Sequence, residues 1–279
     1  MFEATLTAST MAVPIAGLGA LLLGVVQGLT EFLPVSSSGH LVVFQQILPP
    51  EGDEVLFDLV LHVATLLPAM WFFRADLRQM LVDPVRGEGP LWQRPGVRLA
   101  ALVLVATVPT GLIGVIGKEM FESWFERLDI VAAAFVVTGT LLFLTRRLSD
   151  GYRGLMDVPL GYAALIGTVQ GLAITPGISR SGSTIAVALL LGLRRDVAVR
   201  LSFLMCIPAI LGAVLLKLRE VESSGLEPTE LGIGFVAAML SGYAALAWLV
   251  ALVKRGRFGD FSFYVWAMAV VAAVMAVFA

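Results

Sequence analysis

Six long apolar segments run through this chain of 279 residues. They cover roughly 55–74, 97–117, 129–146, 197–217, 230–253 and 261–279, and the fourth begins among arginines and contains Pro208. An apolar stretch of about 20 residues has the length of a helix that spans the hydrocarbon layer of a bilayer. Because only 14% of the residues are charged and the mean hydropathy is +0.90, a water-soluble domain is excluded. The sequence therefore predicts an all-α polytopic membrane protein.

The composition also excludes some partners and bonds. The net charge is −2 and no basic stripe with interleaved aromatic residues occurs, so we expect no nucleic acid partner. A single cysteine, Cys206, cannot form a disulfide within the chain, and its apolar surroundings favour a packing role. The N-terminal segment has no basic region and no small-residue cleavage site, so we expect no removable signal peptide.

A thirteen-residue segment occurs twice, at 27–39 and at 170–182, with an offset of 143 positions. Six positions are identical: Gln27 and Gln170, Gly28 and Gly171, Leu29 and Leu172, Ser36 and Ser179, Ser38 and Ser181, and Gly39 and Gly182. This similarity indicates a duplication, and we expect two repeats, 1–150 and 151–279. The second copy lacks counterparts of Glu31 and His40, and it has Arg180 where the first copy has Ser37.

Each copy lies at the centre of an apolar region, at about 14–48 and 158–194. The Pro, Gly and Ser residues of these centres break a helix and leave backbone groups unpaired, which a cavity lined by protein can satisfy and lipid cannot. We therefore expect a re-entrant helical hairpin in each repeat, followed by three spans; an ordinary kinked span is the alternative. Three spans are an odd number, so the two repeats should run in opposite directions as an inverted repeat, with the two hairpin tips meeting near the midplane.

The positions of the basic residues predict the orientation. With two hairpins and six spans, fourteen of the 19 Lys and Arg residues fall on one face and four on the other, while Arg180 stays inside the protein. The basic face is expected to be cytoplasmic, which puts both termini on the outer side. The longest connection, at about 75–96, contains several Pro and Gly residues, and its Arg-rich composition predicts a cytoplasmic linker near anionic headgroups.

The first motif carries acid–base and anion-binding groups. Gln27 and Glu31 are four residues apart and share one face of a helix, and a carboxylate at membrane depth is typical of a functional cavity. Hydroxyls and backbone N–H groups of a turn that contains Ser36, Ser37 and Ser38 can bind an anion. His40, which ends this turn, can transfer a proton or attack phosphorus.

The second motif supplies a cation. Arg180 lies between Ser179 and Ser181, and its planar guanidinium matches two oxygens of a phosphate group. Its partner inside the membrane must be Glu31 or a bound anion. Together the two motifs predict a phosphate site within the membrane. The other histidine, His62, is one turn from Asp58, and a local ion pair or hydrogen bond explains it.

At these residues the sequence resembles a known family. The segment QGLTEFLPVSSSGH is similar to the Glu/Gln-x-x-x-Glu segment and Ser-rich loop of bacterial undecaprenyl-pyrophosphate phosphatases associated with bacitracin resistance. The segment PGISRSGST resembles the Pro-Gly-x-Ser-Arg-Ser-x-x-Thr segment of the same family. The likeness extends over essentially the whole chain. Gln27 stands where many relatives have Glu, which leaves Glu31 as the only carboxylate of the motif.

The resemblance implies hydrolysis of undecaprenyl pyrophosphate to the monophosphate and inorganic phosphate, which recycles the lipid carrier of cell-wall synthesis. It also implies a multi-pass protein of the bacterial inner membrane and a divalent cation, Mg²⁺ or Ca²⁺, with Glu31 as the candidate ligand. Of the motif residues, Glu31, Ser37, His40 and Arg180 are the candidate catalytic residues. The candidate substrate-binding residues are Gln27, Ser36, Ser38, Ser179, Ser181 and Thr184. Whether Ser37, His40 or a water attacks phosphorus stays open.

Two other functions have some of the same features. An inverted repeat with broken helices is also the architecture of secondary transporters, so a lipid-phosphate flippase or an ion-coupled transporter is the alternative. The segment Ser38-Gly39-His40 is also found in phosphatases of the phosphatidic-acid type, but those need a second histidine after the Ser-Arg pair, and no histidine follows Arg180. The expected partners are a polyprenyl pyrophosphate and membrane lipid, with a homodimer left open. The active site is expected to open to the outer side.

Overall fold

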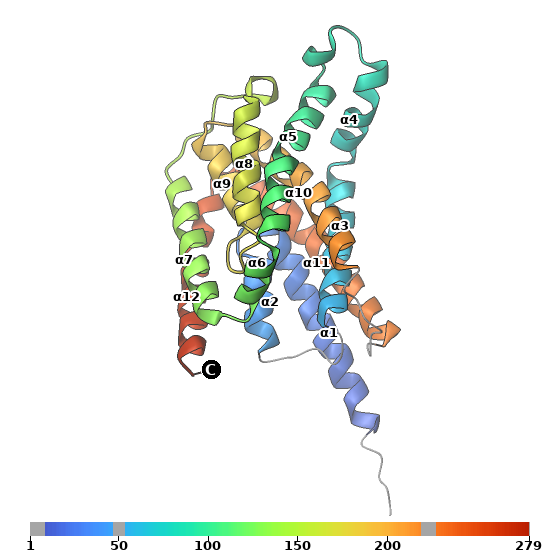
Figure 1. Cartoon of the computed structure of the whole chain (residues 1–279), viewed down its shortest axis with the longest axis vertical. Coiled ribbons are helices and arrows are strands. Elements are labelled where there is room, and N and C mark those ends of the chain that lie inside the picture. Colours follow the sequence, from blue (N-terminus) through green and yellow to red (C-terminus); the bar gives the residue numbers. More distant parts are fainter. Residues whose placement is uncertain (1–8, 47–53, 219–226, 279) are drawn as a thin grey trace, which may run out of the picture.

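The computed structural model describes residues 9–46, 54–218 and 227–278. In these residues the protein consists of twelve α-helices and three short 3₁₀ helices, without a β-strand (Figure 1). The six predicted spans are confirmed as helices that are long and apolar enough to cross a membrane. These are α3 (Glu54–Phe72), α5 (Pro95–Ile116), α7 (Leu128–Thr145), α10 (Arg195–Lys217), α11 (Pro228–Lys254) and α12 (Phe261–Phe278).

The two motif regions form two pairs of shorter or broken helices. The first pair is α1 (Ser9–Phe32) and α2 (Ser37–Gln45), and the second is α8 (Leu160–Leu172) and α9 (Arg180–Leu190). In Figure 1, α1 rises from the lower end of the molecule and α2 returns toward it, while α8 descends from the upper end and α9 returns upward. Pro34 interrupts the first pair, and Pro176 with Gly177, at a φ of 95°, interrupts the second.

Each motif pair packs against a span of the other half of the chain. Helix α1 lies along α11, and α8 lies along α5. Glycines allow the close approach: a Cβ on Gly24 would meet the carbonyl oxygen of Gly234 at 2.5 Å, and one on Gly167 would clash with the backbone of Ala106. Small residues at such contacts let helix backbones pack closely in a membrane. The two halves are therefore interleaved rather than placed side by side as separate domains.

The connection at 75–96 differs from the prediction. Instead of an irregular linker it contains α4 (Arg74–Arg86) and the 3₁₀ helix η1 (Leu91–Gln93), and a further helix, α6 (Lys118–Phe125), follows α5. The C-terminal carbonyls of α4 at Asp83 and Pro84 accept hydrogen bonds from Arg94 Nη1, at 2.8 and 3.4 Å. Side-chain donors of this kind stabilise a helix end that would otherwise leave carbonyls unpaired. The cytoplasmic location of this connection stays a prediction.

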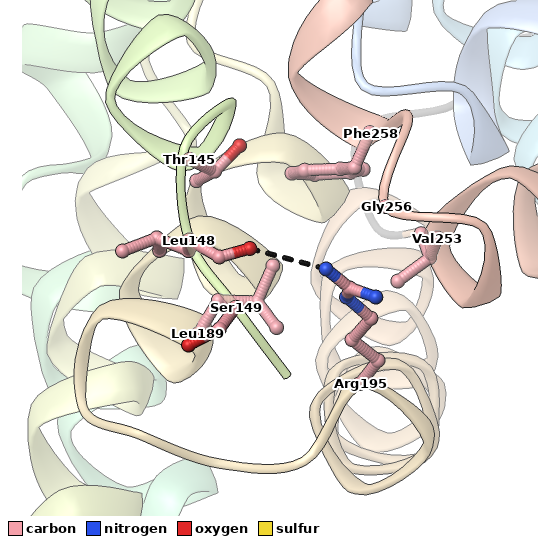
Figure 2. A pocket seen from close by; sticks show the side chains of 8 residues that line it. All are labelled: Thr145, Leu148, Ser149, Leu189, Arg195, Val253, Gly256 and Phe258. Atoms are coloured by element: carbon pink, nitrogen blue, oxygen red, sulfur yellow. Dashed lines mark hydrogen bonds between the residues drawn. The ribbon is translucent and has the colours of Figure 1, made fainter. Parts of the chain in front are cut away.

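Polar side chains connect the helices at the end of the molecule where α4 and the start of α10 lie. Arg200 of α10 forms an ion pair with Asp76 of α4. Figure 2 shows a small pocket, of about 10 Å³, between the ends of α7, α9 and α11 and the start of α10. There Arg195 Nη2 donates to the carbonyl oxygen of Leu148 at 3.1 Å. A space of this size holds at most one water, so it is a structural junction and not a substrate site.

Candidate active site

Helices α2 and α9 begin with the same capping hydrogen bond, although the φ of the N-cap residue is 70° at Ser36 and −73° at Ser179. The hydroxyl oxygen of Ser36 accepts a hydrogen bond from Gly39 N at 3.3 Å, and that of Ser179 accepts one from Gly182 N at 3.0 Å. These residues are equivalent in the duplicated sequence, and serine is a preferred N-cap because its oxygen pairs an N–H group that the helix leaves free. The duplication is therefore visible as two equivalent helix N-termini.

The two capped turns are bonded to each other. Gly177 N donates to Ser36 Oγ at 3.1 Å, and Ser181 Oγ donates to the carbonyl oxygen of Leu33 at 3.2 Å. Gly39 and Gly177 approach so closely that a Cβ on Gly39 would lie 2.8 Å from the Gly177 Cα. Ser36 has a φ of 70°, the only positive φ of a non-glycine residue in the described chain, and such strain is typical of functional turns.

Thr138 of α7 also holds the second turn in place. Its hydroxyl donates to the carbonyl oxygen of Gly177 at 2.9 Å and accepts from Ser179 N at 3.0 Å. The side chain is 1% exposed. Nothing in the sequence marks this threonine as different from others in apolar spans, so sequence reasoning missed it.

Glu31 is the centre of the polar cluster, and only 6% of it is exposed. Its Oε1 accepts from Arg180 Nη2 at 2.6 Å. Its Oε2 accepts from Ser37 Oγ at 2.6 Å and from Gln27 Nε2 at 3.1 Å. The structure thus brings together four of the predicted residues, three from the first repeat and one from the second.

The pair of Glu31 and Arg180 is largely buried, and the Arg180 side chain is 16% exposed. Removing one partner of such a pair leaves an uncompensated charge, at a cost of about 3–5 kcal/mol. Arg180 Nη1 is buried and has no hydrogen-bond partner among the described residues. The guanidinium neutralises the carboxylate, and the exposed 16% of the Arg180 side chain is the part that an anion can reach.

His40 is more enclosed than the sequence suggested. It is 1% exposed, and its ring stacks on Tyr264 and meets Phe135 edge-on. Its Nδ1 lies 2.8 Å from the carbonyl oxygen of Ser36, and its Nε2 lies 2.8 Å from the Tyr264 hydroxyl. Both ring nitrogens are engaged, so the visible contribution of His40 is to hold the carbonyl of the Ser36 cap. Its catalytic role stays a prediction.

The remaining predicted residues support the turns. Ser38 Oγ is 3.4 Å from Ser36 Oγ, and Ser179 Oγ is 3.4 Å from Ser181 Oγ. Thr184 is fully buried; its hydroxyl donates to the Arg180 carbonyl oxygen at 2.7 Å and lies 2.6 Å from Ser202 Oγ. These contacts place Thr184 behind Arg180, and its substrate contact stays a prediction.

His62 of α3 lies beside the cluster, although the sequence offered a local explanation for it. Its Nδ1 bonds to the backbone carbonyl of Asp58 at 2.7 Å, while its Nε2 lies 4.0 Å from Glu31 Oε2. His62 lies two turns from the start of α3, and no pattern in the sequence indicated that it would reach Glu31.

By themselves, these residues do not form a complete site for Mg²⁺ or Ca²⁺. Ca²⁺ takes six to eight oxygen ligands, among them carboxylates, while Mg²⁺ takes one or two carboxylates together with waters and substrate phosphates. Glu31 is the single carboxylate of the cluster, and both of its oxygens already accept hydrogen bonds. The part of the chain that the structure describes contains no group of three or more His, Cys, Asp or Glu that could hold a metal ion.

Comparison with known proteins identifies the family of this chain. Residues 20–271 match the family model described as bacitracin resistance protein BacA. Several relatives carry the name undecaprenyl-diphosphatase. The protein of Halothermothrix orenii is 39% identical over 257 residues, which covers 91% of this chain and 96% of the relative. The protein of Desulfosudis oleivorans is 44% identical over 262 residues, covering 90% and 94%. The chain therefore belongs to the bacitracin resistance protein BacA family.

Proposed function

We propose that this protein hydrolyses undecaprenyl pyrophosphate to undecaprenyl phosphate and inorganic phosphate, and so recycles the lipid carrier of cell-wall synthesis and gives resistance to bacitracin. The family and the names of its relatives support this activity. The observation that carries it here is the cluster of Arg180, Glu31 and Ser37 at two facing helix N-termini.

The diphosphate binds where these helices begin. The N-terminus of a helix carries a partial positive charge and free N–H groups, which favour phosphate. Helix α2 begins at Ser37 and α9 begins at Arg180. Arg180 adds its full charge, and its side chain is 16% exposed. Phosphoryl transfer depends mainly on positioning and on neutralising charge, and these groups supply both.

Ser37 is the best-placed nucleophile. Its hydroxyl donates to Glu31 Oε2 at 2.6 Å and is partly exposed, so a base and an approach for phosphorus are both present. Ser37 Oγ attacks the terminal phosphorus as its proton passes to Glu31, the bridging P–O bond breaks, and undecaprenyl phosphate leaves. Water then attacks the phosphorus of the phosphoserine, and the bond from phosphorus to Ser37 Oγ breaks. Glu31 returns its proton to Ser37 Oγ, and inorganic phosphate leaves with the oxygen and both protons of the water. His40 is less suited to attack because both of its nitrogens are engaged.

The architecture that we propose is an inverted repeat with two re-entrant hairpins. Equivalent packing supports it, since α1 lies on α11 as α8 lies on α5, and so do the equivalent caps at Ser36 and Ser179. The opposite directions of the two helix pairs in Figure 1 support it too. Both hairpins would end at the shared site near the midplane, which brings one repeat's carboxylate to the other's arginine.

We also propose an orientation in the bacterial inner membrane. The start of α1 and the C-terminal end of the chain lie at the lower end of the molecule in Figure 1, opposite α4. The charge distribution along the sequence favours the outer side for this lower end and the cytoplasm for the basic end. The active site would open to the outer side through its partly exposed residues, Ser37 and His62. A homodimer stays a prediction that light scattering of the purified protein would check.

The divalent cation, Mg²⁺ or Ca²⁺, stays a prediction. A bound cation would neutralise charge on the diphosphate, and because the protein offers one carboxylate, Glu31, most of its ligands would come from the substrate and water.

Phosphate release is the direct test of the proposed function. Purified protein in detergent is given a polyprenyl pyrophosphate, and inorganic phosphate and polyprenyl phosphate are measured over time. Hydrolysis in detergent, where no membrane separates two compartments, distinguishes the phosphatase from a flippase or an ion-coupled transporter. A protein that moves the lipid between leaflets of vesicles without releasing phosphate would contradict the proposal.

A further inference from the structure

His62 reaches the active-site cluster from a different helix than any predicted site residue. It lies on α3, and its Nε2 is 4.0 Å from Glu31 Oε2, the oxygen that also accepts from Ser37. The side chain of His62 is 32% exposed, whereas that of Glu31 is 5% exposed. His62 therefore lies on the open side of the carboxylate, while Gln27 is fully buried.

The backbone determines which ring nitrogen of His62 carries hydrogen. Nδ1 is 2.7 Å from the carbonyl oxygen of Asp58, and a carbonyl oxygen can only accept. Nδ1 is thus the donor, and in the neutral ring Nε2 holds a lone pair. Among the described residues, Nε2 has no hydrogen-bond partner. It is an acceptor that points toward the cluster and is left available to water.

The chain has two histidines, and they differ in this respect. The Nε2 of His40 is already bonded to the Tyr264 hydroxyl within a shell of aromatic rings. Of the two, only His62 presents a free ring nitrogen to the polar cluster. Ser37 Oγ lies 2.6 Å from Glu31 Oε2, and His62 Nε2 lies 4.0 Å from the same Oε2 atom. A phosphoryl group on Ser37 therefore lies within reach of His62.

We propose that His62 is a further catalytic residue, which accepts a hydrogen bond from the attacking water and orients it toward phosphoserine 37. The proposal deepens the proposed phosphatase function and rests on it. His62 can hold a water molecule on the exposed side of Glu31. When this water attacks phosphorus, the Ser37 oxygen that leaves is next to Glu31, and Glu31 protonates it.

The second step balances without another reactant. The bond from the water oxygen to phosphorus forms and the bond from phosphorus to Ser37 Oγ breaks. The proton that Glu31 took from Ser37 in the first step returns to Oγ, and the protons of the water leave on inorganic phosphate. His62 orients the water through its lone pair and ends the step unchanged. The first step, attack by Ser37, does not require it.

Rapid-quench kinetics on the full-length protein separates the two steps. In His62→Ala we expect one equivalent of polyprenyl phosphate per enzyme to form quickly, with phosphate retained on Ser37 and detectable by mass spectrometry. Steady-state release of inorganic phosphate should fall on the order of a hundredfold, the loss expected when a reacting group is no longer held in position. His62→Gln keeps a hydrogen-bond acceptor near the same place and should recover part of the loss.

Thr65→Ala is the matched control on the same helix, because the Thr65 hydroxyl donates to the carbonyl oxygen of His62 at 2.8 Å without reaching the cluster. It should release phosphate at close to the wild-type rate per folded protein. Wild-type kinetics in His62→Ala, or an equal loss of both products without retained phosphate, would overturn the proposal. If the wild-type protein releases no phosphate, the proposed function itself fails, which is a different result.

Discussion

Arg180 Nη2 and Glu31 Oε1 are 2.6 Å apart although the residues are 149 positions apart in the sequence. The pair joins the start of α9 to the end of α1, and it lies within a polar cluster that is closed on most sides. A contact of this kind can serve the fold, the substrate or both, and variants of the two residues separate these roles.

The planar guanidinium of Arg180 is expected to be required for turnover. Arg180→Lys keeps the positive charge but cannot make two parallel bonds to a phosphate group, so activity should fall on the order of a hundredfold, or about 3 kcal/mol of transition-state stabilisation. Thermal stability should change little. The control is the double variant Arg180→Met with Glu31→Gln, which removes both charges together. If the lysine variant is fully active, and if the double variant restores the stability that each single variant loses, the pair serves the fold alone.

Adjacent serines should separate stability from chemistry. Ser37→Ala removes the proposed nucleophile at a partly exposed position, and phosphate release should fall on the order of 10³-fold or more, with a nearly unchanged melting temperature. Ser36→Ala removes the acceptor of Gly39 N and Gly177 N, so it should lower the free energy of unfolding by about 2 kcal/mol. Turnover and thermal unfolding measured on both variants check this, and persistent turnover in Ser37→Ala would favour direct attack by water.

His40 should matter for stability as well as activity. From the sequence alone, His40→Ala is predicted to abolish turnover with folding close to wild type. Its burial against Tyr264 and Phe135 adds a stability cost of about 2–4 kcal/mol, as for other large buried side chains. Tyr264→Phe, which removes only the hydroxyl at Nε2, should cost about 1 kcal/mol and keep most activity. An inactive His40→Ala protein with wild-type stability would instead indicate a direct chemical role.

A chelator is expected to lower the turnover of the wild-type protein, because a divalent cation neutralises the diphosphate. Since the described residues form no site with several carboxylates, the ligand-free protein should bind Ca²⁺ only weakly, with a dissociation constant above about 1 mM. Isothermal titration with and without a non-hydrolysable diphosphate lipid measures both. Full activity in excess chelator would exclude the cation from the reaction.

The outward orientation of the termini can be checked with reporter fusions. An alkaline phosphatase fused after the last residue should be active, because that enzyme matures only outside the cytoplasm. A fusion in the loop that follows α4, at Gly89, should be inactive. The reverse pattern would invert the topology and place the site's open side toward the cytoplasm.

Much of the architecture could be predicted because it follows from local pattern. Apolar length identified six spans to within about two residues at each described end, and the spacing of four predicted that Gln27 and Glu31 share a face, which the 3.1 Å hydrogen bond confirms. The duplicated segment predicted equivalent turns, and both begin a helix capped by serine. Periodicity and composition are sufficient for such features.

No local sequence pattern predicted the contacts between residues that are far apart in the chain. His62 has Asp58 one turn away, which explained it locally, and nothing in the sequence indicated that its other nitrogen would face Glu31. Thr138 looked like any threonine in an apolar span, yet it bonds to both ends of the second turn. Helix α4 was missed because the side chain of Arg94, which pairs its terminal carbonyls, lies outside the helix.

The pairing of Glu31 with Arg180 also has a consequence for how the protein is made. Glu31 is synthesised well before the ribosome reaches residue 180, so until then its carboxylate lacks the cation that neutralises it in the folded protein. Ser36 Oγ likewise lacks its hydrogen bond from the N–H group of Gly177 until that residue is synthesised. The first half of the chain therefore cannot reach its final structure alone, because Glu31 and Ser36 need partners from the turn between α8 and α9 and from the start of α9.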